Sequence, residues 1–271
     1  MNRLLVVSFA AAFALDLVVP ILIALWMRRR WSLPLRLWSV GAGVFAVSQG
    51  VLRIPIVTVV QGLPAVQEAI GRSLGAYVVF AAALSLSAGL FEEGGRWIGL
   101  RYFIRERGGA QALFYGAGHG GIESIAIGLL VLGSLIGYVT LEALPAQAAA
   151  PLSAEQAAKL EAARAQFAAL AGWEPLLGAW ERLAAQVLHL LFSLLVLQAF
   201  LRSPLWWWAA VAAHTGVNLS TLLLQHLAAG RWGAGRAGVL TEGLLTLYAL
   251  AAVWGIRRLM RVEREPARPS A

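Results

Sequence analysis

The amino-acid sequence predicts an all-α membrane protein, a polytopic transmembrane helix bundle of about seven spans. Of its 271 residues, 59% are hydrophobic and only 13% are charged, whereas soluble domains carry about 25% charged residues. The apolar residues gather in segments of about 20 or more, the length that a helix needs to cross a bilayer. A soluble helical bundle would need a polar face on most helices, and most segments here have none.

Seven apolar segments are long enough to span a membrane. They cover residues 4–27, 37–60, 74–100, 111–139, 176–201, 205–227 and 237–258. The first is too long for the core of a signal peptide, so we expect it to be retained as a helix. The second contains Gln49, Arg53 and Pro55, which predict a kinked helix in the interior of the bundle. The third contains Gly94–Gly95, where a break would give eight elements.

The basic residues predict how the chain is oriented. When the apolar segments are placed across a membrane, thirteen arginines fall on one side and six basic residues on the other. The positive-inside rule assigns the richer side to the cytoplasm. We therefore expect a multi-pass protein of the cell membrane with its N-terminus outside and its C-terminus in the cytoplasm. The net charge of +8 reflects this placement, so we expect no nucleic-acid partner.

We expect one helical domain over residues 1–262. Its longest connection, 140–175, lies outside the cytoplasm and is partly helical, since Ser153 is a suitable N-cap with Glu155 in the first turn. This helix is either a solvated connector or lies on the membrane surface or against the bundle. Residues 263–271 are polar and contain proline, which predicts a disordered cytoplasmic tail. The absence of cysteine excludes disulfides, thiolate metal sites and a cysteine nucleophile.

Three polar motifs lie inside apolar segments, where ionisable side chains are costly and indicate a functional site. They are FEEGGR at 91–96, FYGAGHGGIES at 114–124 and HTGVN at 214–218. By helical rise, Glu93, His119 and His214 all lie roughly 12–14 Å inside the cytoplasmic boundary. Unrelated polar positions would scatter through a core about 30 Å thick, so the shared depth favours a single site.

Each motif also holds two polar residues four positions apart, and such residues share one face of a helix. The pairs are Glu92 with Arg96, His119 with Glu123, and His214 with Asn218. We therefore expect three helices to present these pairs to one cavity. Glycines surround His119, and small residues permit close helix packing in membranes.

These side chains suit peptide hydrolysis, which needs a nucleophilic water, a base and hydrogen-bond donors to the oxyanion. Glu92 or Glu93 is a suitable base, and Arg96 can hold the second carboxylate ionised and oriented. His119 can orient the water or bind a metal through its neutral imidazole. Reaction by water alone and reaction with a metal both remain open at this stage.

His214 and Asn218 can donate hydrogen bonds to the oxyanion. Alternatively, His119, His214 and Glu92 can bind a zinc ion that keeps an open position for water. Two other classes of function use buried glutamate and histidine: an ion- or proton-coupled membrane transporter, and a catalytically silent membrane scaffold. Repeated halves would favour a transporter, and we find no internal repeat.

The motif order resembles the CPBP superfamily of intramembrane proteases, which includes the CAAX prenyl endopeptidases and the PrsW-type proteases. The resemblance rests on Glu-Glu followed by Arg, on Phe-x4-His and on His-x3-Asn, each in a separate segment. The string GAGHGGIES and the later Glu181, Arg182 and His189 most resemble the YhfC family of intramembrane metalloproteases. The resemblance covers about Gln49 to Asn218 and implies a membrane protein or peptide as substrate.

The same resemblance implies roles for single residues. Glu92 corresponds to the water-activating glutamate, with Glu93 and Arg96 as its supporting pair. The remaining catalytic positions are His119, His214 and Asn218. Two residues separate the glutamates from the arginine, where the CAAX enzymes have three, which argues against a prenyl-protein substrate more than against hydrolysis.

Three further residues are expected to support the site: Glu123, His189 and Arg53. His189 lies about 20 Å from the cytoplasmic edge by helical rise. We expect it to orient the residues of the site by contacting them from outside. Arg53 either pairs with Asp16 or Glu123 or contacts substrate. Asp16 is otherwise expected to form a helix-packing hydrogen bond, and Glu181–Arg182 an interfacial ion pair.

Overall fold

The computed structural model describes residues 1–144 and 153–262, and all regular structure within them is helical, which confirms the predicted fold class. Two π-helical segments, η1 (Ala46–Arg53) and η2 (Gly99–Phe103), follow α2 and α5. The predicted tail, 263–271, lies outside the described residues. The α-helices are α1 (Arg3–Trp31), α2 (Leu35–Phe45), α3 (Ile54–Gly62), α4 (Pro64–Arg72), α5 (Leu74–Ile98), α6 (Gly109–Ala143), α7 (Ala154–Ala169), α8 (Pro175–Leu201), α9 (Leu205–Trp232) and α10 (Ala234–Val262).

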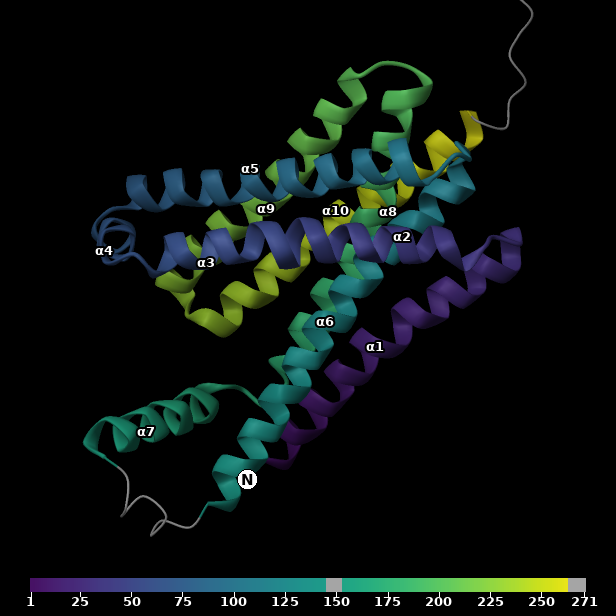
Figure 1. The fold of residues 1–271 in the computed structure, drawn as a ribbon. Coiled ribbons are helices and arrows are strands. Elements are labelled where there is room, and N and C mark those ends of the chain that lie inside the picture. The colour runs from purple at the N-terminus through teal and green to yellow at the C-terminus, as the bar shows by residue number, and fades with distance from the viewer. Residues whose placement is uncertain (145–152, 263–271) are drawn as a thin grey trace, which may run out of the picture.

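The bundle is built around α8, which packs against α1, α5, α6, α9 and α10. Of its most apolar 18 residues 56% are buried, against 28% or less in the other apolar spans. In Figure 1, α1 and α6 run side by side, while α2, α3 and α5 run together in another part of the bundle. Because α8 contacts helices from both ends of the chain, it is the element that fixes their relative positions.

Within the described residues, six helical runs are long and apolar enough to cross a membrane, and they correspond to six of the seven predicted spans. The remaining prediction, 205–227, also forms one helix, the 28-residue α9. It is more polar than the others because it contains His214, Asn218 and Gln225. These side chains explain why length and composition single out six spans and not seven.

The third span is continuous, as the seven-span prediction assumes, whereas part of the second span differs from expectation. α5 continues through Gly94–Gly95 without a break, and π-helical geometry begins only at η2. In the second span, η1 directly precedes α3, whose first turn contains Pro55; proline has no N–H to donate to the preceding turn. The predicted interior position of this span is wrong for α3, which buries no residue.

Glycines allow α6 to approach its neighbours closely. A Cβ at Gly118 would lie 2.0 Å from the carbonyl oxygen of Trp38 on α2, and a Cβ at Gly120 would lie 2.7 Å from the His189 ring on α8. Neither distance leaves room for a side chain. The close packing predicted from these glycines is therefore present on both sides of His119, and it brings α2 and α8 against the site.

The connector helix α7 lies at the edge of the bundle (Figure 1). Ser153 caps it in a reciprocal capping box with Gln156, which confirms the predicted helix start. The Phe167 ring packs against Phe9 and Tyr138, with centroids 6.3 and 5.3 Å apart. α7 therefore leans on α1 and α6 at its C-terminal end, although it buries none of its residues.

The substitution Gly118→Ala is expected to lower the thermal unfolding temperature of the purified protein. The new Cβ would meet the α2 backbone, which cannot yield without separating α2 from α6, and overpacking costs about 1–3 kcal/mol. Gly137→Ala, on the same helix, is the matched control, because a Cβ there meets nothing within 4 Å. Equal unfolding temperatures for the two variants would contradict this account of the α2–α6 contact.

Candidate metal and active site

Three imidazoles and one guanidinium converge on the Glu92 carboxylate. His119 Nε2 on α6 lies 3.3 Å from Oε2, and His189 Nδ1 on α8 lies 3.8 Å from the same oxygen. His214 Nε2 on α9 lies 3.8 Å from Oε1. Arg96, one turn further along α5, places Nη2 3.6 Å from Oε2. All five residues are buried, so four helices meet at one polar centre inside the bundle.

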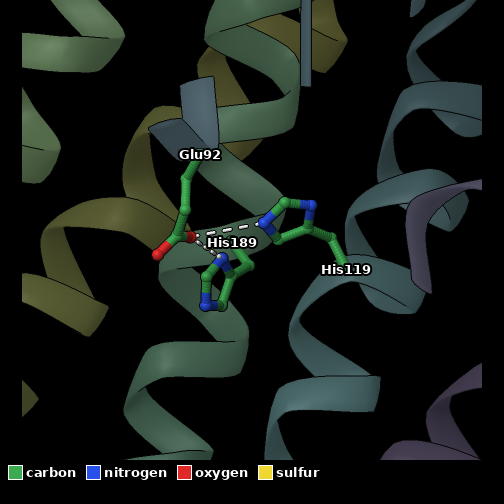
Figure 2. A group of neighbouring side chains, drawn as sticks. All are labelled: Glu92, His119 and His189. Carbon is green, nitrogen blue, oxygen red and sulfur yellow. Dashed lines mark hydrogen bonds and ion pairs between the residues drawn. The ribbon is translucent and has the colours of Figure 1, made fainter. Parts of the chain in front are cut away.

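Glu92, His119 and His189 form a group that can hold a metal ion. Figure 2 shows their side chains pointing toward one another from α5, α6 and α8. Their ligand atoms all lie within 4.8 Å of one another. Ligands about 2.1 Å from a tetrahedral zinc ion lie about 3.4 Å apart, close to the 3.3 and 3.8 Å between Glu92 Oε2 and the two ring nitrogens. One carboxylate and two imidazoles are also a donor set of catalytic zinc sites, so the residues fit a metal.

The His189 ring is held on both sides. Its Nε2 lies 2.6 Å from Glu123 Oε2, so Nε2–H donates to the carboxylate and Nδ1 keeps its lone pair. Arg96 Nη2 donates to that Nδ1 over 3.1 Å. A metal at Nδ1 would replace this contact and the Arg96–Glu92 pair, while Arg96 would keep its hydrogen bonds to Ser193 Oγ and to the His189 carbonyl.

Glu93 is fully buried and orients two neighbours. Its Oε1 lies 2.8 Å from His214 Nδ1, and its Oε2 lies 3.0 Å from Arg96 Nε in an ion pair. When the neutral His214 ring donates Nδ1–H to Glu93, its lone pair is on Nε2, the nitrogen that faces Glu92. An imidazole held this way is suited to accept and return a proton beside Glu92.

The histidine that groups with Glu92 and His119 is not the one in the predicted metal set. The sequence suggests His214 for this place, whereas the geometry groups His189 with them and leaves His214 hydrogen-bonded to Glu93. Helical rise places His189 deeper than the three motifs, because it measures distance along α8 and not depth in the bundle. Figure 1 shows that α8 is inclined to α5, so the two quantities differ. The Asn218 side chain makes no hydrogen bond within the described residues.

Arg53 has partners other than those predicted, whereas Arg182 has one partner in addition to the predicted one. Arg53 donates hydrogen bonds to Ser87 Oγ, Gln49 Oε1 and the Leu84 carbonyl. Its expected pair with Asp16 or Glu123 is therefore wrong. Arg182 binds Glu123 at 2.6 Å and also Glu181. The predicted Glu181–Arg182 ion pair is therefore present; the Glu181 side chain is 42% exposed, whereas only 12% of the Arg182 side chain is exposed.

Ser193 and Trp207 also contact the site, although no motif in the sequence points to either. Ser193 Oγ accepts a hydrogen bond from Arg96 over 3.0 Å, and Trp207 Nε1 donates to the Glu93 carbonyl over 3.0 Å. Ser193 lies four residues after His189, a spacing that places both on one helix face and would have identified it. Trp207 lies in a run of tryptophans near a span end, where an aromatic belt is the ordinary reading.

Comparison with known proteins covers almost all of the chain. A family model described as YhfC intramembrane metalloprotease matches residues 15–232, a range that includes every residue of the polar centre. A Bacillus subtilis (strain 168) protein described as "Uncharacterized membrane protein YhfC" is 30% identical over 266 residues. That match covers 95% of this chain and 97% of the Bacillus protein. No solved structure matches the chain.

The substitution Arg182→Met is expected to destabilise the fold by about 1–3 kcal/mol, because it leaves the Glu123 carboxylate, which is only 22% exposed, without its cation. The matched control is Lys159→Met, which removes an ion pair with Glu155 whose side chains are 75% and 77% exposed and so costs less than about 1 kcal/mol. Thermal unfolding in detergent measures both. A similar, small change in the two variants would show that the Arg182 pair contributes no more than a surface pair.

Proposed function

Because the chain belongs to the YhfC intramembrane metalloprotease family, we propose that it is an intramembrane peptidase that hydrolyses a peptide bond in or near the membrane. The observation that supports this most is the buried group of Glu92, His119 and His189, whose ligand atoms lie within 4.8 Å of one another. These residues would hold a divalent metal, with zinc as the proposed ion.

The proposed reaction adds the oxygen of one water to the peptide carbonyl carbon, breaks the carbon–nitrogen bond and gives a proton to the leaving amine. The bound metal would lower the pKa of the water and polarise the carbonyl. His214 Nε2, which faces Glu92, accepts the proton of the water and later returns it to the amine. Glu93 keeps the ring in this orientation through Nδ1, and Arg96 balances the charge of Glu93.

The orientation with the N-terminus outside and the C-terminus in the cytoplasm is part of this proposal. Arg36, after α1, forms an ion pair with Glu106, after α5, over 3.3 Å, which supports their placement on one membrane side. The N-terminal amine of Met1 pairs with Glu142 near the end of α6, which supports the placement of these two residues together on the opposite side of the membrane. The excess of arginine on the first side supports its assignment to the cytoplasm.

The order of the glutamate, histidine and asparagine motifs supports a further proposal, that the family lies within the CPBP superfamily. The spacing between Glu93 and Arg96 argues against a prenylated protein as substrate. We propose an unmodified apolar peptide segment of a membrane protein instead.

An apolar groove beside the site supports a substrate of this kind. It has a volume of about 700 Å³ and lies between α2–η1 and α5, with Val44, Ser48, Phe91, Gly94 and Gly95 among its lining residues. Volumes of about 300–1,000 Å³ are typical of ligand pockets. The groove adjoins the site because Gly95 follows Glu92 by one helical turn. η1 buries only Ser48 and Gln49, so this wall is loosely packed, and we propose that substrate side chains occupy the groove.

Replacing each of the four histidines by alanine is expected to separate metal binding from proton transfer. His119→Ala and His189→Ala lose the bound metal. His214→Ala keeps it but cleaves about 10²–10⁴-fold more slowly, since the proton acceptor is gone. His226→Ala is the matched control, because His226 stacks on Tyr77 outside the site. Metal analysis of the purified protein and cleavage of a reconstituted reporter with one transmembrane segment provide the measurements.

The Glu92→Gln variant separates the metal mechanism from reaction by water alone. In the metal mechanism it loses bound metal and activity together, and chelation inactivates the wild type. In the water-only mechanism, with Glu92 as base, metal-free wild type stays active and Glu92→Gln does not. Cleavage that persists at the wild-type rate in Glu92→Gln and His119→Ala would reject the proposed function.

Leucine at Gly43 or Gly94 is expected to raise KM for the reporter about tenfold, the effect of losing about 1.4 kcal/mol of apolar contact. A Cβ at either position meets nothing within 4 Å, and both residues line the groove, so the new side chain fills the groove and leaves the fold unchanged. Gly133→Leu and Gly137→Leu are the matched controls, since a Cβ there also meets nothing. An unchanged KM in the groove variants, with unfolding temperature and metal content preserved, would place the substrate elsewhere.

A further inference from the structure

A second buried polar cluster lies between α1, α6 and α8, apart from the Glu92 centre. Its members are Asp16, Ser124 and Gln186, which are 2%, 4% and 3% exposed. Together with Pro20 and Arg182 they line a cavity of about 10 Å³. A sphere the size of one water molecule needs about 10–15 Å³, so the cavity has room for one water or one ion of smaller radius.

Several polar atoms around this cavity have no protein partner among the described residues. Within residues 1–144 and 153–262, both carboxylate oxygens of Asp16 and both amide atoms of Gln186 are buried without a hydrogen bond; the predicted packing hydrogen bond of Asp16 is therefore wrong. Pro20 lies within α1 and has no N–H to donate to the Asp16 carbonyl four residues earlier. Each unsatisfied buried polar group costs about 1–3 kcal/mol, so the cluster gains considerably from a ligand that binds several oxygens at once.

The charge around the cavity favours a cation as that ligand. Arg182 is already shared between Glu123 and Glu181, and it forms no ion pair with Asp16 within the part of the chain described. Asp16, Glu123 and Glu181 against one arginine leave two negative charges in excess. A carboxylate away from water is costly unless it is paired, and hard cations prefer carboxylate, amide and carbonyl oxygens.

We propose that this cavity binds one small monovalent cation of the size of sodium. The ligands are the Asp16 carboxylate, Gln186 Oε1 and Ser124 Oγ, with the Asp16 carbonyl, to which Pro20 has no N–H to donate. Gly128 helps to build the site, because a Cβ there would lie 2.9 Å from Asp16 Cβ and would push α6 away from α1.

The cation site is connected to the candidate metal centre. Arg182 lines the cavity and binds Glu123 Oε1, while Glu123 Oε2 accepts from His189 Nε2, each over 2.6 Å. A cation beside Asp16 therefore stabilises the packing of α1, α6 and α8 on which the position of His189 depends. This inference needs no assumption about catalysis, and cation binding can be measured on protein without metal or substrate.

The test is the thermal stability of chelator-treated protein in detergent as sodium chloride replaces choline chloride at constant ionic strength. We expect sodium to raise the unfolding temperature by about 2–4 °C at concentrations above its Kd, and radioactive sodium to bind once per chain. Asp16→Asn and Gln186→Leu should lose both effects. Gln198→Leu is the matched control, because Gln198 lies on the same helix, is equally buried and also has both amide atoms unpartnered.

Each other result overturns the proposal. Equal stabilisation by potassium and choline would indicate ionic strength alone. A sodium response that persists in Asp16→Asn and Gln186→Leu, or that disappears equally in Gln198→Leu, would place the effect elsewhere. If the stability does not depend on sodium and rises only as the pH falls, the cavity holds a proton or a water and not a metal cation. If Asp16→Asn does not fold, Pro20→Ala tests the same site, because it restores an N–H to the Asp16 carbonyl and should weaken sodium binding.

Discussion

The candidate site depends on one buried cation, the Arg96 guanidinium. It is fully buried and forms an ion pair with Glu93 over 3.0 Å. Its other nitrogens donate to Ser193 Oγ, to the His189 carbonyl and to His189 Nδ1. A guanidinium inside a membrane-spanning helix is stable only where its charge and its N–H groups are met. These contacts fix the register of α5 against α8, and with it the position of Glu92 between the histidines.

His189 joins the two polar networks of the molecule. Arg96 approaches its Nδ1 and Glu123 accepts from its Nε2, so one neutral ring links the Glu92 centre to the pairs around Arg182. Gly120 makes this possible, because any side chain there would occupy the place of the ring. The orientation of His189 is therefore set by groups on both sides of the ring, as expected of a metal ligand whose other ring nitrogen donates to a carboxylate.

The sequence alone could predict which helices carry the site, because ionisable residues are conspicuous in apolar segments. A spacing of four also places Glu92 and Arg96 on one helix face, and likewise His119 and Glu123. It could not predict partners between helices, which depend on how each helix is rotated and tilted. For that reason Arg182 and not Arg53 proved to be the partner of Glu123, and helical rise misplaced His189.

The arrangement of charge indicates what the buried carboxylates are for. Glu92 and Glu93 face one arginine, and Asp16, Glu123 and Glu181 surround a second, so both clusters hold more negative than positive charge when the histidines are neutral. Well-packed apolar residues in these places would give equal or greater stability. Stability therefore does not explain why the carboxylates are there, whereas the proposed binding of cations would: a divalent ion at Glu92, where two imidazoles add nitrogen ligands, and a monovalent ion at Asp16, where the ligands are oxygens alone.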